Sequence, residues 1–119
     1  QAAPAQRDKV RGRSCIVCGQ SPCDPAHTIS RAKGGDDDPR CVVPLCRPHH
    51  RAFDSQGFSI LEFMEPDHRL EIAYAVEKVG LINAFEQLAG KVALISKQSI
   101  EALKKANEIR LSRAAVKRH

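Results

Sequence analysis

Two short motifs of cysteine and histidine give the first indication of chemistry in this chain. Cys15 and Cys18 stand in CIVCG, and Cys46 and His49 stand in CRPH, with 27 residues between the two motifs. Zinc prefers four sulfur or imidazole ligands in a tetrahedron, and two tight turns usually supply them as two pairs. Gly19 suits the first of these turns. The spacing therefore predicts a structural Zn²⁺ site, and the alternative is four unrelated side chains.

A second pair of side chains suits a harder cation. His50 directly follows His49, and a helix rotates successive residues by about 100°, so the two imidazoles face different directions. Asp54 lies four residues after His50, on the same face of a predicted helix. A histidine and an aspartate in this arrangement can hold a divalent ion that keeps open water positions. The alternative is an ordinary surface pair, and His27 alone is an unremarkable histidine.

The elements that must position these side chains are predicted from the same stretch. Residues 26–29 and 41–45 are predicted as short strands. Residues 31–40 contain two Gly, three Asp and a Pro, which is typical of a turn-rich loop. Residues 47–55 are predicted as a helix that ends before Gly57. Together they give a strand–loop–strand–helix unit of the α+β class.

The second half of the chain is predicted to be helical. The apolar residues of a helix over 66–79 share one face: Leu70, Ala73, Val76 and Val79. A short helix is predicted over 81–89, and a polar helix over 96–116. We expect these helices to complete the core, and the alternative is a helix-turn-helix.

Charge is concentrated at the two ends of the 119-residue chain. Residues 1–14 carry a net charge of +3, residues 15–90 of −4 and residues 91–119 of +6. Basic ends favour a polyanionic partner, and an acidic centre can hold a metal. The alternative is solvated charge that keeps the protein in solution.

The composition also excludes some classes of protein. No apolar stretch of about 18 residues predicts a transmembrane helix, and no segment is typical of a signal peptide. We therefore expect a cytoplasmic protein with no membrane partner. Five cysteines are an odd number for a disulfide scaffold. Cys23 is a reserve zinc ligand, and either Cys23 or Cys41 is expected to be a buried free thiol.

Residues 13–56 resemble the HNH endonucleases, also called ββα-metal or His-Me finger nucleases. The resemblance depends on CIVCG, AHTISRAKGG and DDPRCVVPLCRPHHRAFD. It implies a small ββα-metal motif, braced by the zinc site and followed by helices. It also implies hydrolysis of DNA phosphodiester bonds with Mg²⁺ or another divalent cation. The matching positions make His27 the general base and His50, with Asp54, the catalytic ligands of that cation.

Two positions depart from the family pattern. Cys41 stands where the family has an asparagine that braces the loop, so we expect a backbone carbonyl of residues 31–40 to accept the Nδ1 proton of His27. Ala26 stands where the family often has a metal-binding Asp or His. The cation then has two protein ligands unless Asp24 or one of Asp36, Asp37 and Asp38 also reaches it, and Mg²⁺ binds through few protein ligands plus water and phosphate oxygens. These departures support a rival hypothesis of a zinc-dependent DNA-binding module without catalysis, and a third of a purely structural zinc protein.

The sequence thus predicts three segments. Residues 1–12 are expected to form a flexible basic arm, residues 13–90 the zinc-braced nuclease domain with its supporting helices, and residues 91–119 a basic helical tail that binds DNA. Arg31 and Lys33 lie close to His27 in the sequence and are candidate phosphate contacts. The family resemblance suggests a phage or mobile-element protein, with phage or restriction proteins as further partners.

Overall fold

The computed structural model describes residues 2–55 and 57–90. The helix predicted over 96–116 and the basic tail of residues 91–119 lie outside the described residues. The elements follow one another as α1 (Pro4–Val10), β1 (Cys23–His27), β2 (Val42–Cys46), α2 (Arg47–Asp54), α3 (Arg69–Val79) and α4 (Leu81–Ala89), with short 3₁₀ turns at Arg31–Lys33, Pro39–Cys41 and Leu61–Phe63. The order β1–β2–α2 confirms the predicted α+β class and the ββα unit.

β1 and β2 pair as an antiparallel hairpin whose register joins Cys23 to Cys46. Pro25 and Pro44 stand opposite each other in its centre, and neither can donate a ladder hydrogen bond. The carbonyl of Pro44 points out of the hairpin and accepts from the N–H of Ile16 at 3.1 Å. Pro25 and Pro44 form a non-hydrogen-bonded pair of the antiparallel ladder, so the hairpin loses no hydrogen bond through either proline.

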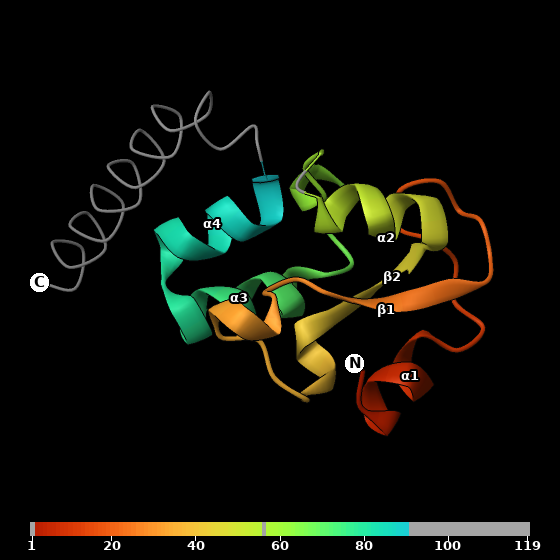
Figure 1. Cartoon of the computed structure of the whole chain (residues 1–119), viewed down its shortest axis with the longest axis horizontal. Coiled ribbons are helices and arrows are strands. Elements are labelled where there is room, and N and C mark those ends of the chain that lie inside the picture. The colour runs from red at the N-terminus through yellow and green to blue at the C-terminus, as the bar shows by residue number, and fades with distance from the viewer. Residues whose placement is uncertain (1, 56, 91–119) are drawn as a thin grey trace, which may run out of the picture.

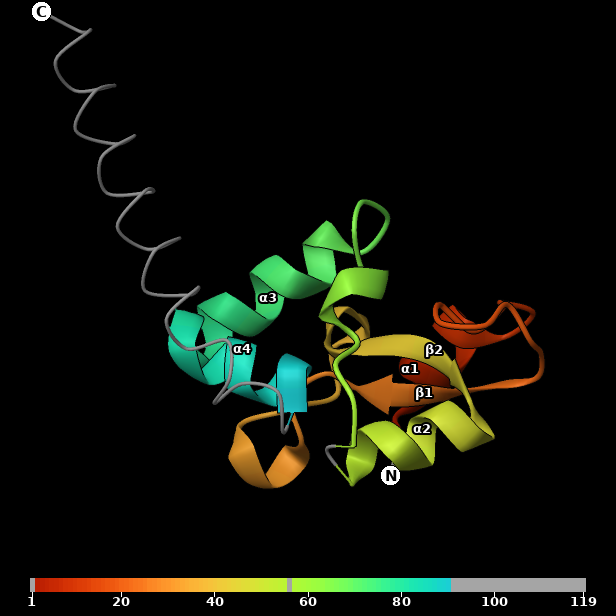
Figure 2. The ribbon, with the colours of Figure 1, turned by 90° about the horizontal axis from the view of Figure 1, so that it is seen from above.

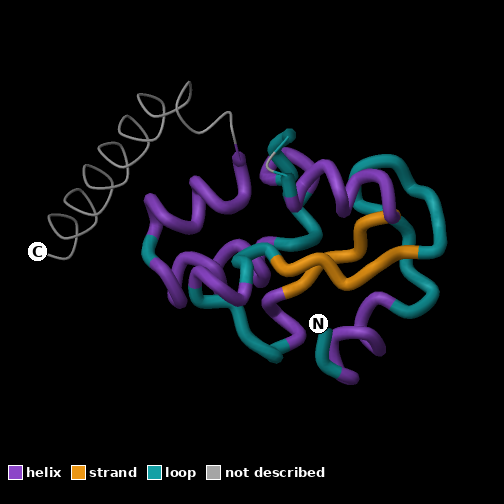
Figure 3. Tube along the Cα trace, viewed as in Figure 1, coloured by secondary structure: helices purple, strands orange, loops and turns teal. Residues whose placement is uncertain are grey.

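Helices cover both sides of this hairpin. Figure 1 shows α2 above the hairpin and α1 below it, with α3 and α4 together at one end, and the tube in Figure 3 follows the same path. One core cluster joins the hairpin to α2 and the segment after it, and includes Val43, Leu45, Phe53, Ile60 and Met64. A second cluster joins the inter-strand loop to α3 and α4, as expected of helices that complete the core: Ile29, Cys41, Tyr74, Ala75 and Ala84.

The N-terminal segment forms a packed helix where a flexible arm was expected. Pro4 occupies the first turn of α1, where its missing N–H costs no helix hydrogen bond. Gln6 and Val10 lie four residues apart, therefore on one helix face, and are 0% and 3% exposed. The basic composition hid this buried face, because a polar Gln6 gives no hydrophobic signal.

The buried face of α3 also differs from the predicted one. Leu70 is 60% exposed and Ala73 is exposed, whereas Glu71 and Tyr74 are buried. Glu71 can be buried because Lys9 of α1 pairs with its carboxylate at 2.8 Å. Apolar spacing alone could not find a face whose residues are polar and paired. Seen from above, α3 and α4 lie side by side next to the hairpin (Figure 2). Among the described helices, none has the length and apolarity needed to cross a bilayer.

Candidate metal centre and catalytic groove

The four predicted zinc ligands come together at one end of the hairpin. Each of Cys15, Cys18, Cys46 and His49 offers a donor atom, and these atoms all lie within 4.8 Å of one another. The sulfur atoms of Cys18 and Cys46 are 3.6 Å apart, and His49 Nδ1 lies 3.2 Å from the Cys46 sulfur. A tetrahedral zinc ion with Zn–S bonds of about 2.3 Å places its sulfur ligands about 3.8 Å apart. The cluster therefore has the donor atoms and the spacing for zinc.

Local structure explains why these ligands converge. Gly19 adopts a φ of 76°, a left-handed conformation that few other residues adopt, and its N–H donates to the carbonyl of Cys15 at 2.9 Å. This closes the turn that carries Cys15 and Cys18. Cys46 ends β2 and His49 lies in the first turn of α2, where its ring packs against Phe58 with 5.6 Å between centroids.

The chemistry of this cluster favours a thiolate. Burial opposes ionisation of Cys15, but hydrogen bonds from the backbone N–H groups of Cys46, Cys18 and Val17 outweigh it and lower the pKa of Cys15 to about 6. The reserve ligand Cys23 is not one of the four clustered residues, and its thiol donates to the carbonyl of Gln20.

A separate groove holds the remaining candidate residues. It has a volume of about 660 Å³ and is open to solvent. β1 contributes Asp24, Pro25 and His27, and α2 contributes His50 and Asp54; Ala2, Arg7, Ser30 and Arg31 complete its lining. It thus follows the free edge of β1 and brings together the three residues predicted for catalysis. We call it the catalytic groove.

His50 is held between two carboxylates in this groove. Its Nδ1 lies 3.0 Å from Asp24 Oδ2, and its Nε2 lies 3.3 Å from Asp54 Oδ2. Hydrogen bonds from Arg47 and His50 lower the pKa of Asp24, so its carboxylate is ionised and only accepts. Nδ1 therefore donates to Asp24, and Nε2 is the ring nitrogen that faces Asp54.

This arrangement leaves two donor atoms free for a cation. Magnesium bonds of about 2.0–2.1 Å at right angles place neighbouring ligands about 3 Å apart. The 3.3 Å between His50 Nε2 and Asp54 Oδ2 is close to that spacing. Asp24 therefore braces the imidazole from behind, as carboxylates commonly do for metal-binding histidines. Of the described residues, only the cluster of Cys15, Cys18, Cys46 and His49 brings three or more such side chains together, so His50 and Asp54 are a pair of candidate ligands without a third side chain.

His27 stands at the end of β1, half-buried in the same groove. Its Nε2 lies 3.2 Å from the backbone carbonyl of Asp36. A carbonyl only accepts, so Nε2 carries the proton and Nδ1 holds the free lone pair. A carbonyl from the loop thus braces the ring as expected, but at Nε2 where Nδ1 was predicted. Burial lowers the pKa of His27, which keeps the ring neutral.

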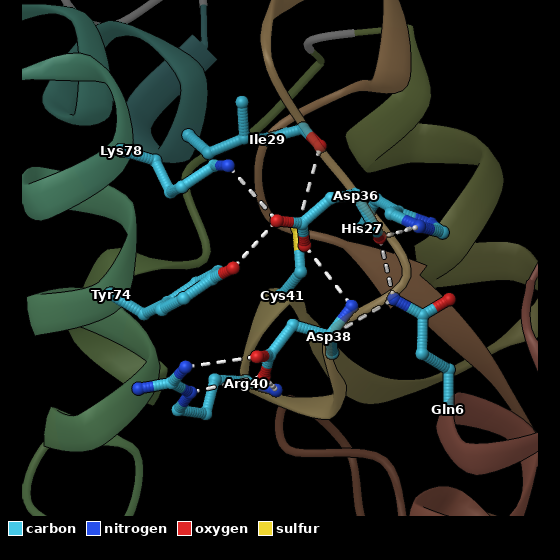
Figure 4. A network of polar contacts seen from close by, with 9 residues as sticks. All are labelled: Gln6, His27, Ile29, Asp36, Asp38, Arg40, Cys41, Tyr74 and Lys78. Atoms are coloured by element: carbon cyan, nitrogen blue, oxygen red, sulfur yellow. Dashed lines mark hydrogen bonds and ion pairs between the residues drawn. The ribbon is translucent and has the colours of Figure 1, made fainter.

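The loop carbonyl that holds His27 is itself held by a network drawn in Figure 4. The carbonyl of Asp36 accepts a second hydrogen bond from the buried amide of Gln6 at 2.7 Å. The Asp36 carboxylate accepts from the hydroxyl of Tyr74 at 2.6 Å and pairs with Lys78 at 3.0 Å. Two helices that lie before and after the loop in the chain, α1 and α3, therefore fix one loop residue.

Gln6, Asp24, Asp36 and Tyr74 are the site residues that the predictions missed or left unassigned. Asp24 and Asp36 were considered only as additional metal ligands. Tyr74 is the only tyrosine of the chain, which was the one available signal for it. Gln6 carries no recognisable signal, since nothing in its neighbourhood predicts contact with a loop 30 residues away.

The two departures from the family pattern have structural counterparts. Ala26 is fully buried, and Asp24 supplies the carboxylate that approaches His50. Cys41 is buried as a free thiol, and its backbone carbonyl accepts from both the N–H and the hydroxyl of Thr28 at 2.8 and 3.1 Å. Hydrogen bonds between Thr28 and the Cys41 carbonyl thus stabilise the end of the hairpin, while the Asp36 carbonyl orients the ring of His27.

The two candidate phosphate contacts lie in different places. Arg31 lines the catalytic groove and pairs with Asp37 at 2.5 Å. Lys33 lines a separate depression with Val79, Asn83 and two other residues of α4, Glu86 and Gln87.

Comparison with known proteins gives one match. The family model of the HNH endonucleases matches residues 15–61. This segment runs from the first zinc-cluster cysteine through β1, β2 and α2. No curated protein and no solved structure shows significant similarity to the chain.

Proposed function

Because residues 15–61 are an HNH endonuclease domain, we propose that this protein is a metal-dependent endonuclease that hydrolyses phosphodiester bonds of DNA. The observation that carries the proposal is the catalytic groove, which His27, His50 and Asp54 line together. Phosphodiester hydrolysis needs a base that activates water and positive charge beside the phosphate. The groove offers a candidate base, His27 from β1, and two candidate ligands for a cation, His50 and Asp54 from α2.

His27 is the proposed general base. Its Nε2–H is committed to the carbonyl of Asp36, so Nδ1 is the atom that takes the proton from the attacking water. Since the ring is neutral and fixed from behind, it needs no change of tautomer before reaction. After the transfer the imidazolium keeps its hydrogen bond to Asp36, and that bond favours the charged form.

His50 Nε2 and Asp54 Oδ2 are the proposed protein ligands of a divalent ion such as Mg²⁺ or Mn²⁺. When bound there, such an ion would neutralise charge on the phosphate and on the leaving 3′ oxygen. Asp24 keeps His50 in the tautomer that binds metal, by accepting from Nδ1. The proposed structural ion is Zn²⁺, held by the separate cluster of Cys15, Cys18, Cys46 and His49.

Nicking of supercoiled plasmid by the full chain tests the proposal. Wild type with Mg²⁺ or Mn²⁺ should convert plasmid to the open circular form, and His27→Ala should lower the rate by about 10²–10⁴-fold, the usual contribution of a general base. His68→Ala is the matched control, because His68 does not line the catalytic groove. If His27→Ala nicks at the wild-type rate, the general-base assignment is wrong.

The main rival is a zinc-dependent DNA-binding module without catalysis. DNA binding with no nicking under either metal would favour that rival. Loss of both binding and nicking would favour a purely structural zinc protein. With an active enzyme, the family resemblance suggests a cytoplasmic protein of phage or mobile-element type, acting beside phage or restriction proteins.

A further inference from the structure

The catalytic groove does not end at the predicted catalytic residues. A second open groove, of about 680 Å³, lies between α1 and the segment that enters β1. Arg7, Asp24 and Pro25 line both grooves, so the two grooves adjoin at these residues beside β1. From the junction, the second groove passes α1 and reaches Pro22 and Cys23, next to the zinc cluster.

The second groove is lined by basic side chains. Arg7, Arg11 and Arg13 face one acidic lining residue, Asp24, which already pairs with Arg47 and His50. Within the described residues, Arg7 and Arg13 form no ion pair, and Arg11 pairs only with the largely exposed Asp8 at 2.9 Å. A pair as exposed as this is weak and is screened by salt. The groove therefore carries unneutralised positive charge.

The fold holds these arginines in place. Arg7 lies in α1 and Arg11, four residues later, is the C-cap residue of that helix, so the two side chains start about 6 Å apart along the helix axis beside the groove. The neighbouring face of α1 is fixed to the core by Gln6 and Val10, and Lys9 pairs with Glu71 of α3. A helix anchored in this way presents its charges as a fixed track.

We propose that a DNA strand follows this track, leaving the catalytic groove past Arg7 and running along α1 toward the zinc cluster. Arg7 holds the phosphate nearest the reacting one, and Arg11 and Arg13 hold the phosphates beyond it. That the track leads to a reacting phosphate rests on the proposed function. That the three arginines bind DNA does not rest on it. Guanidinium groups suit this role because they bind phosphate through two parallel hydrogen bonds.

The test is the salt dependence of DNA binding by the full chain. Affinity for a fluorescently labelled duplex is measured with EDTA in place of Mg²⁺, so that no cleavage takes place. Each lost phosphate contact reduces the slope of log affinity against log salt by about 0.9, which corresponds to about eight-fold weaker binding at 0.1 M salt. Arg7→Gln and Arg13→Gln should each show this loss, and Arg13→Lys should keep the wild-type slope.

Arg51→Gln is the matched control, because Arg51 is an exposed arginine of α2 that lines neither groove. Its slope should equal that of wild type. A wild-type slope for the Arg7→Gln, Arg13→Gln double variant, or an equal loss in Arg51→Gln, would overturn the proposed track. Thermal unfolding confirms that each variant is folded.

Binding and nicking separate the two proposals. A reduced slope in a protein that never nicks DNA would support the track and contradict the proposed enzyme. An unchanged slope in a protein that nicks through His27 would contradict the track and leave the enzyme intact.

Discussion

The zinc cluster and the catalytic groove meet on two neighbouring residues of α2 but are built in different ways. His49 belongs to the cluster and His50 to the groove. The cluster takes its ligands from one tight turn and from the junction of β2 with α2, and its donor atoms all lie within 4.8 Å of one another. The groove takes its two proposed metal ligands from α2, its proposed base from β1 and the carbonyl that braces this base from the loop between the strands.

The difference reflects two tasks: the cluster is suited to stabilising the fold, and the groove is suited to positioning reacting groups. A zinc site is closed by its own four ligands, so local sequence spacing is sufficient to define it. The groove must keep donor atoms free for water, cation and substrate, so other elements have to hold its residues in place. In this protein α1 and α3 do so through Gln6 and Tyr74.

Loss of a zinc ligand should have the largest effect. Cys46→Ser should abolish zinc binding and unfold the chain, because zinc contributes roughly 10 kcal/mol to small folds and domains of this size are stable by only about 5–15 kcal/mol. Zinc content and thermal unfolding measure both effects. Cys23→Ser is the control and should keep the ion, since Cys23 lies outside the cluster. A zinc-free sample that stays folded would contradict the prediction.

Replacing each of the two neighbouring histidines, His49 and His50, with alanine tests whether the cluster and the groove act independently. His50→Ala should lower Mg²⁺-dependent nicking by at least about 100-fold, or about 3 kcal/mol, while the zinc content stays at one ion per chain. His49→Ala should lose the zinc and the cooperative thermal transition. Asp54→Asn should behave as His50→Ala. Nicking at the wild-type rate by Asp54→Asn would mean that the metal ligands are assigned wrongly.

Removing the tyrosine hydroxyl should show how strongly α3 supports the groove. Tyr74→Phe deletes the hydrogen bond to the Asp36 carboxylate, and a bond to a charged group contributes about 1.5–3 kcal/mol. We expect a loss of this size in unfolding free energy and a fall in kcat of about ten-fold with KM unchanged, since His27 loses its fixed orientation. Arg69→Gln, on the exposed side of α3, is the control. Reduced stability with normal kcat would limit Tyr74 to a role in folding.

The pH dependence of cleavage should show the smallest effect. Burial lowers the pKa of His27, the charge of Arg31 acts in the same direction, and the Asp36 carbonyl and Asp37 oppose them. A base must be neutral, so kcat/KM should fall only below the pH at which an ordinary histidine, with a pKa of about 6.5, becomes protonated. The rate measured from about pH 5 to 8 gives the midpoint. A midpoint above 6.5 would contradict this environment for His27.

Several elements were predictable because their signals are local. Two cysteine-containing turns, the Gly-rich and Asp-rich loop, and the His/Asp pair on one helix face are each defined within a few residues. Helices α2 and α4 lie where they were predicted, over Arg47–Asp54 and Leu81–Ala89. The first strand runs over Cys23–His27, earlier than the predicted 26–29, because its pairing with β2 extends back to Cys23 and two prolines obscured the pattern.

By itself, the sequence predicted the cluster of four residues that could bind zinc, the ββα order and the grouping of His27, His50 and Asp54, because each depends on residue type and short spacing. Only the tertiary structure decided that residues 4–10 form a helix against the hairpin, and that Gln6 and Tyr74 reach Asp36 from helices that lie before and after it in the chain. The physical reason is that a hydrogen bond between distant residues leaves no periodicity in the sequence. Which nitrogen of His27 is free depends on such a bond, so it could not be deduced from spacing.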